Sequence, residues 1–172
     1  GTDSLGRDVL SRLIHGCRIA LTVAFAASIL ACIVGTALGL LAGYFGGWAD
    51  LVISRLIDIW MAFPPVLFSI LLIAVLGPGL MSIIIAIVVI DWTRFARVVR
   101  AEAMTQGAMD YVASAQVAGR SRIGTMVTEI LPNVLPTIVV LLTLEMGIAV
   151  IVEAILSSMN LLISTDDTTW GG

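Results

Sequence analysis

The sequence predicts an all-α membrane protein, a polytopic bundle of about four transmembrane helices. Hydrophobic residues make up 59% of its 172 residues and charged residues only 12%, whereas soluble domains average roughly 25% charged residues. Several apolar runs also approach or exceed the roughly 20 residues that a helix needs to cross a bilayer. We therefore expect a membrane domain over residues 19–157, between segment 1–18 and a polar tail over residues 158–172.

Segment 4–18 has a hydrophobic half and a polar half when its residues are placed about 100° apart on a helix. This pattern predicts a helix that lies in the membrane interface before the first span, on the periplasmic side. The first span, residues 19–44, carries no charge. Its glycines at every fourth position share one face, which lets another helix approach closely, and we predict packing rather than a solute-lining role. These helix-packing residues are Gly35, Gly39 and Gly43.

The second predicted span, residues 51–76, is irregular. Arg55 and Asp58 are one turn apart near its start, a spacing that allows an ion pair within one helix. Pro64 and Pro65 remove backbone donors and should kink or break the helix within the membrane. Because broken helices are tolerated where the backbone is buried or lines a cavity, both a nearby solute path and simple packing are compatible with this break.

The third predicted span is apolar only over residues 80–90. This run is too short to cross a bilayer, so the helix should continue through Asp91 towards Arg94 and Arg97. A carboxylate near the membrane boundary needs a partner, and Arg94 is one helical turn from Asp91. We therefore predict that Arg94 neutralises Asp91.

The fourth predicted span, residues 134–156, has Pro136 in its first turn, where proline is tolerated. Carboxylates inside a span are costly and usually face the bundle interior or water. Glu145, near the middle, is equally compatible with a functional role and with a buried ion pair, whereas Glu153 is predicted to anchor or cap structure at the far interface. The tail from residue 157 is predicted as a solvent loop. The candidate intramembrane polar residues are Asp58, Asp91, Glu145 and Glu153.

The arginines predict the orientation of the chain. Cytoplasmic loops carry the excess of basic residues, and the connections over residues 45–55 and 94–133 hold six arginines against three on the other side. The loop over residues 101–133 is therefore predicted to be cytoplasmic. The six are Arg55, Arg94, Arg97, Arg100, Arg120 and Arg122, and the three are Arg7, Arg12 and Arg18.

This cytoplasmic loop contains a short helical pattern, with apolar positions at Tyr111, Val112, Ala115 and Ala118. Residues 110–118 are therefore predicted to form a helix whose small side chains can enter a partner's groove closely. Arg120 and Arg122 follow where a helix C-terminus favours cations. Pro132 is predicted to separate this docking element from the next span.

The sequence contains no catalytic constellation. One histidine and two separated cysteines form no metal-ligand cluster of the usual kind, and no Gly-rich phosphate loop with its lysine occurs. No basic and aromatic surface for nucleic acid is present either. We therefore expect no catalytic residue, metal site, cofactor or nucleic-acid partner. An intramembrane enzyme that uses the four carboxylates is disfavoured, because they lie at different depths.

Four stretches resemble the inner-membrane permease subunits of binding-protein-dependent ABC importers, in particular the dipeptide, oligopeptide and nickel group. They are GTDSLGRDVLSRLIHGCRIAL at 1–21, GLLAGYFGGWAD at 39–50, AFPP with a later LGPG at 62–79, and the loop at 113–132. The loop resembles the family's EAA motif, with Ala113 in place of its acidic residue. The matching positions are Ala113, Ser114 and Ala115, then Gly119, and finally Ile130, Leu131 and Pro132.

The resemblance implies the core of a six-span permease with a coupling helix that docks on a cytoplasmic ATPase. It implies three protein partners in a bacterial or archaeal plasma membrane: an ATP-binding cassette subunit, a second homologous permease subunit and an extracytoplasmic solute-binding protein. The expected function is import of di- or oligopeptides or a similar small solute, nickel included, with ATP hydrolysis left to the partner. The alternative is a non-transporting or decayed membrane scaffold. The implied ATPase-coupling residues are Tyr111, Ala113, Ser114, Ala115, Gly119, Arg120, Arg122, Ile130, Leu131 and Pro132.

Overall fold

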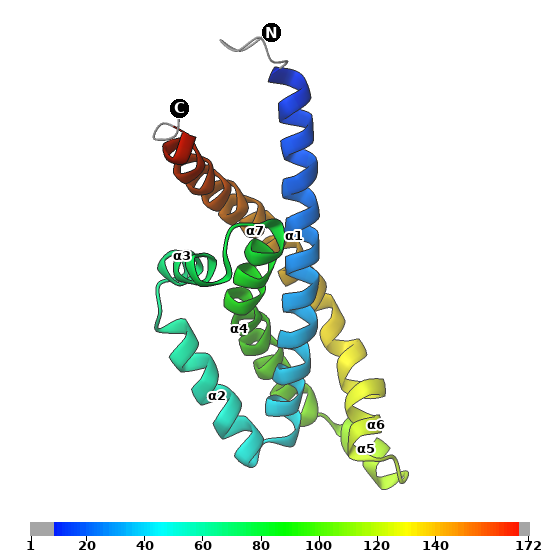
Figure 1. The fold of residues 1–172 in the computed structure, drawn as a ribbon. Helices are drawn as coiled ribbons and strands as arrows, with labels where there is room; N and C mark the ends of the chain where they lie inside the picture. Colours follow the sequence, from blue (N-terminus) through cyan, green and yellow to red (C-terminus); the bar gives the residue numbers. More distant parts are fainter. Residues whose placement is uncertain (1–8, 169–172) are drawn as a thin grey trace.

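The computed structural model describes residues 9–168, which fold into helices and short connections. Three long helices form the bundle: α1 (Val9–Leu40), α4 (Leu80–Gly107) and α7 (Leu131–Thr168). α1 packs along α4, and α7 packs against both (Figure 1). The helical, polytopic bundle predicted from the sequence is confirmed.

α1 is one continuous helix that leads into a π-helical turn, η1 (Leu41–Phe45). Residues 9–40 contain no proline that would stop a helix. The boundary expected at residue 18 is therefore not a break, since residues 9–18 and the first span belong to the same helix. Residues 1–8 of the predicted interfacial segment lie outside the described residues.

The second predicted span is broken at its prolines, as expected. α2 (Gly47–Met61) starts after Gly46, whose φ of 65° suits glycine. α3 (Pro65–Leu76) starts at Pro65, the first helical position, where a missing N–H leaves no hydrogen bond unmade. Pro64 is extended, with ψ of 123°, because a residue before proline avoids the helical region. The two helices meet at 90°.

Within the described chain, Ile14–Phe45 and Arg122–Ile151 are long and apolar enough to cross a membrane, and the bent pair α2 and α3 adds a third if it is one span. The sequence predicted about four spans. The predicted span that is missing from this count is α4, because Asp91, Arg94 and Arg97 interrupt its apolar run.

The chain rejoins the bundle after α5 (Asp110–Val117) without a joint. α6 (Arg122–Thr125), the π-helical turn η2 (Met126–Ile130) and α7 follow one another directly. The separation predicted at Pro132 and the span start predicted near Pro136 are therefore both wrong, since both prolines lie inside the continuous helix.

The π-helical turn explains how the helix accommodates Pro132. Leu131 donates its N–H to the Met126 carbonyl, five residues back, so the regular hydrogen-bond ladder is already displaced where the N–H of Pro132 is missing. Asn133 Nδ2 also donates to the Glu129 carbonyl at 2.7 Å. The backbone groups that a proline frees are thus partly satisfied by neighbouring groups.

α7 continues to Thr168, so the solvent loop predicted after residue 157 is wrong as far as that residue. From residue 148 to residue 168 the sequence contains neither glycine nor proline, the two residues that most strongly end a helix. The rest of the predicted tail, residues 169–172, lies outside the described residues.

The glycine stripe of α1 faces α4. A Cβ on Gly35 would lie 2.4 Å from the Trp92 carbonyl oxygen, and one on Gly39 would lie 2.8 Å from the Ala96 carbonyl oxygen. Gly43 meets the α4 backbone in the same way, at 2.5 Å. Because real Cβ atoms essentially never come within 3.0 Å of such atoms, the two helices lie too close together for any larger residue at these positions.

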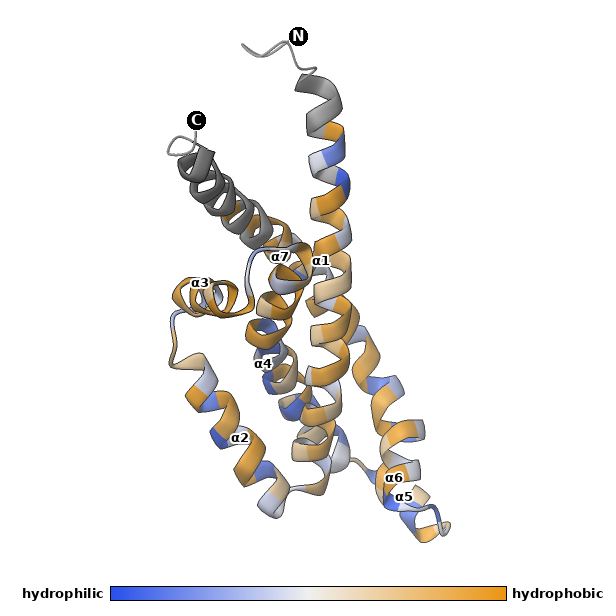
Figure 2. Cartoon of the chain, viewed as in Figure 1, coloured by the Kyte–Doolittle hydropathy of each residue, from blue (hydrophilic) through white to orange (hydrophobic). Residues whose placement is uncertain are grey.

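The outward faces of α1, α3 and α7 are largely apolar (Figure 2). Their exposed side chains include Phe25 on α1, Leu67 and Val75 on α3, and Val140 and Leu144 on α7. Such large exposed apolar areas are unusual on a soluble monomer, whereas they match the hydrocarbon core of a bilayer.

Candidate functional site

α5 lies at the end of the bundle away from the start of α1 and the described end of α7 (Figure 1). Val112 is buried in one apolar cluster with Ile130 and Val134 of the following helix. Ala113 and Ser114 are exposed on α5. One side of α5 therefore anchors it to the bundle, and a side with small residues remains exposed.

Three of the four apolar positions of the predicted 110–118 helix are turned towards the bundle, whereas Ala118 is exposed. Tyr111 is half-buried, and its hydroxyl donates to Gln106 Oε1 at 2.7 Å. Burial raises the pKa of the Tyr111 hydroxyl, so this group is a neutral donor at physiological pH. Ala115 is also half-buried, whereas Val117 is 90% exposed. The open surface of α5 is therefore centred on Ala113, Ser114 and Val117.

Gly119 ends α5 because its φ of +87° lies in the left-handed region. Its N–H donates to the Gln116 carbonyl at 3.0 Å, and the N–H of Arg120 donates to the Ala115 carbonyl at 3.2 Å. These two bonds are the pair that defines a Schellman motif, in which a glycine closes a helix and satisfies its last carbonyls. The backbone conformation therefore explains why a glycine stands at position 119, which the sequence analysis identifies as a candidate residue.

Gly119→Ala is expected to loosen the C-terminal end of α5, because a non-glycine residue in the left-handed region costs about 1–2 kcal/mol. Hydrogen exchange of the Gln116 to Arg120 amides should become faster while exchange in α4 stays unchanged. Gly119→Asn is the matched control, since asparagine tolerates this region better, and its effect should be smaller. Equal exchange in all three proteins would contradict the assignment.

Two aromatic residues of η1 connect α5 and α6 to the end of α1. Gln116 Nε2 donates to the Tyr44 hydroxyl at 2.8 Å. The Arg122 guanidinium lies 5.8 Å from the Tyr44 ring centre and 5.1 Å from that of Phe45, within cation–π range. Sequence reasoning missed Tyr44, Phe45 and Gln116, because a contact across 72 positions leaves no local signal.

The other predicted coupling residues lie on the connection and the next helix. Arg120 pairs with Glu129 at 2.5 Å and donates to Thr128. Ile130 is fully buried against the α5 anchor. Leu131 is half-buried, and Pro132 is exposed on the continuous helix.

The four candidate polar residues have different environments. Asp58 is exposed, and no ion pair joins it to Arg55 among the residues that the structure describes. Glu145 is buried and accepts from Arg94 Nη1 at 3.0 and 3.2 Å. The predicted Asp91–Arg94 pair is therefore wrong: Arg94 reaches α7, because a long side chain can bridge to a carboxylate on the next helix. The side chain of Glu153 lies outside the described residues.

A second ion pair, which sequence reasoning missed, joins α4 to the start of α2. Arg100 donates to Asp50 through both Nε and Nη2, the latter at 2.9 Å. Ser54 donates to the same carboxylate at 3.0 Å. A two-point contact between a guanidinium and a carboxylate fixes both distance and orientation. It therefore fastens the first turn of α2 to the half of α4 that leads to α5.

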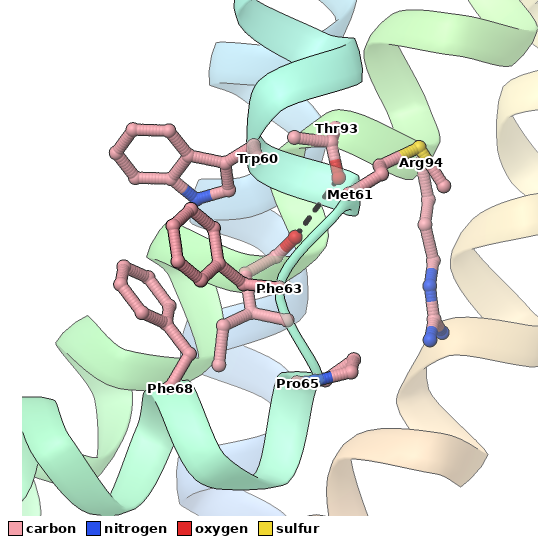
Figure 3. A pocket seen from close by; sticks show the side chains of 8 residues that line it. Trp60, Met61, Phe63, Pro65, Phe68, Thr93 and Arg94 are labelled. Atoms are coloured by element: carbon pink, nitrogen blue, oxygen red, sulfur yellow. Dashed lines mark hydrogen bonds between the residues drawn. The ribbon is translucent and has the colours of Figure 1, made fainter.

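A cavity of about 70 Å³ lies beside the proline break. Trp60, Phe63 and Phe68 line one side, while Arg94 points away from them towards α7 (Figure 3). Pockets that bind small molecules typically measure roughly 300–1,000 Å³, so this cavity could hold only part of a peptide. No group of three metal-ligating side chains occurs within the described part of the chain.

The amino-acid sequence matches a known protein family and several curated proteins. Residues 35–163 match the family described as the binding-protein-dependent transport system inner membrane component. The chain is 39% identical to the dipeptide transport system permease protein of Alkalihalophilus pseudofirmus, over 99% of this chain and 56% of that protein. It is 36% identical to the glutathione transport system permease protein of Pectobacterium atrosepticum, over 99% of this chain and 57% of that protein.

The oligopeptide transport system permease protein of Bacillus subtilis is also 36% identical, over 99% of this chain and 56% of that protein. The chain thus spans about half the length of the curated relatives it matches. The family match covers the end of α1, the broken helix pair, α4, α5 and most of α7. The chain therefore belongs to the family of inner membrane components of binding-protein-dependent transport systems.

Proposed function

We propose that this chain forms the core of the permease subunit of an ABC importer for di- or oligopeptides or a similar small solute, with nickel as a further candidate. The observation that carries the proposal is the family match over residues 35–163, which includes α4, α5 and most of α7. The names of the relatives support a transport role rather than a membrane scaffold.

α5 is the surface proposed to dock on a cytoplasmic ATPase subunit. Its small exposed residues leave room for a groove to close around it, the helix-in-groove mode of recognition. Three links support its use as a lever: the buried Val112, the Gln116–Tyr44 hydrogen bond and the Arg122 contact with η1. Closure of the ATPase would then move α5 together with α1 and α7. ATP hydrolysis belongs to that partner in this proposal.

A second homologous permease subunit and an extracytoplasmic solute-binding protein complete the proposed transporter in a bacterial or archaeal plasma membrane. The small cavity beside the proline break supports a path shared with another subunit, because it is too small for a whole peptide. The helices would switch between outward-facing and inward-facing arrangements, and the solute would cross the membrane as they switch.

Cross-linking tests the docking surface. Ser114→Cys in the full-length permease, paired with a single cysteine in the groove of the co-expressed ATPase, should give a cross-link whose yield changes when ATP binds. Met81→Cys, exposed near the other end of α4, is the control and should give none. No ATP-sensitive product from Ser114→Cys would overturn the docking proposal.

A further inference from the structure

Three charged side chains gather where α3, α4 and α7 meet. Arg94 pairs with Glu145, whose side chain is only 4% exposed. Asp91, one turn before Arg94 on α4, is 5% exposed. Two carboxylates therefore share this buried region with one guanidinium, and the guanidinium is bound to Glu145.

Asp91 has no hydrogen bond or ion pair to any residue that the structure describes. An ionised carboxylate in such a place is costly, so it must either hold a proton or meet a cationic group. Arg94 does not meet that requirement by direct contact, because its described hydrogen bonds go to Glu145 and none goes to Asp91.

A cavity of about 40 Å³ opens at Asp91, with Arg94, Pro65, Ser69 and Ile148 among its walls. One water molecule needs roughly 10–15 Å³ of such space, so the cavity has room for an ammonium group. It shares Pro65, Ile90 and Arg94 with the aromatic-lined cavity beside the proline break. The unpartnered carboxylate therefore faces space next to the broken helix.

We propose that Asp91 binds the protonated amino group of the transported solute, so that this subunit favours solutes with a free ammonium group, such as the N-terminus of a peptide. The inference rests on the proposed function. Glu145 acts as a positioning residue, because it holds Arg94 on α7 and leaves Asp91 available. The remainder of the solute lies beyond the small cavity.

Uptake of two matched solutes tests the inference. Alanyl-alanine carries a free amino group, and lactoyl-alanine carries a hydroxyl group in its place. The complete transporter, with the full-length permease, is reconstituted into proteoliposomes with ATP and its binding protein saturated by each solute. The wild type should import alanyl-alanine about tenfold faster or more, since losing one partner of a buried charge pair costs at least that factor.

Asp91→Asn should lower alanyl-alanine uptake about tenfold and bring the ratio of the two solutes close to one, whereas Asp91→Glu should keep the wild-type preference. Glu102→Gln, at a half-buried carboxylate near the C-terminal end of α4, is the control and should change neither rate. Wild-type uptake and preference in Asp91→Asn would overturn the inference, because a protonated, structural carboxyl tolerates that change.

The wild type and Asp91→Glu decide the matter if Asp91→Asn does not assemble. A preference kept in both proteins supports the inference, and equal import of the two solutes by the wild type overturns it. A wild-type transporter that imports no peptide would instead overturn the proposed function, which separates the two failures.

Discussion

Replacing Gly35 with leucine is expected to reduce recovery of the folded protein to a small fraction of the wild-type yield. Even a Cβ there would lie 2.4 Å from both the Trp92 carbonyl oxygen and the Phe95 Cβ. A carbonyl oxygen in a helix cannot rotate away, so α1 and α4 must separate along their length. Overpacking of this kind typically costs about 1–3 kcal/mol and occasionally more. The measurement is the monodisperse fraction after detergent extraction, together with the thermal midpoint.

Gly16→Leu on the same helix is the matched control, because a Cβ on Gly16 meets nothing within 4 Å. Leucine is also the better helix former by up to about 1 kcal/mol, so this variant should be as stable as the wild type or slightly more stable. Gly35→Leu with an unchanged yield and midpoint would show that α1 and α4 do not lie this close in the membrane.

The parts of the fold that depend on residues close together in the sequence were predictable from it. The glycine stripe, the break at Pro64 and Pro65, and the short helix before Gly119 each follow from spacing or from backbone conformation. Pro132 and Pro136 misled the prediction for the same local reason. The sequence predicts a separation at Pro132 and the first turn of a span at Pro136, but the π-helical turn η2 absorbs the missing donor of Pro132 within a continuous helix.

The partners of the charged residues were not predictable from the sequence. Arg94 has Asp91 one turn away, yet it pairs with Glu145, 51 positions later. Asp50 likewise pairs with Arg100, and Tyr44 with Gln116. Which of two carboxylates an arginine reaches depends on how the helices pack, and helix periodicity carries no information about the facing helix.

Arg94→Leu is expected to be the most destabilising single change among the charged residues of the bundle. It leaves Glu145, with a side chain 4% exposed, without its counter-charge, and Asp91 is a second buried carboxylate nearby. Removing one partner of a buried ion pair typically costs about 3–5 kcal/mol. The thermal midpoint of the purified protein should fall accordingly. Lowering the pH should partly restore it, because protonation removes the uncompensated charge.

Glu145→Leu should be milder, although it breaks the same ion pair. The Arg94 side chain is 34% exposed and can reach water, and Asp91 lies one helical turn away as a replacement partner. The double variant Arg94→Leu with Glu145→Leu should recover much of the loss, since hydrophobic replacement of a buried pair is often neutral. Equal losses in both single variants would contradict this asymmetry.

If Asp91 binds the solute's amino group, Glu145→Leu should also assemble normally yet import alanyl-alanine poorly, because Arg94 then occupies the carboxylate that the solute needs.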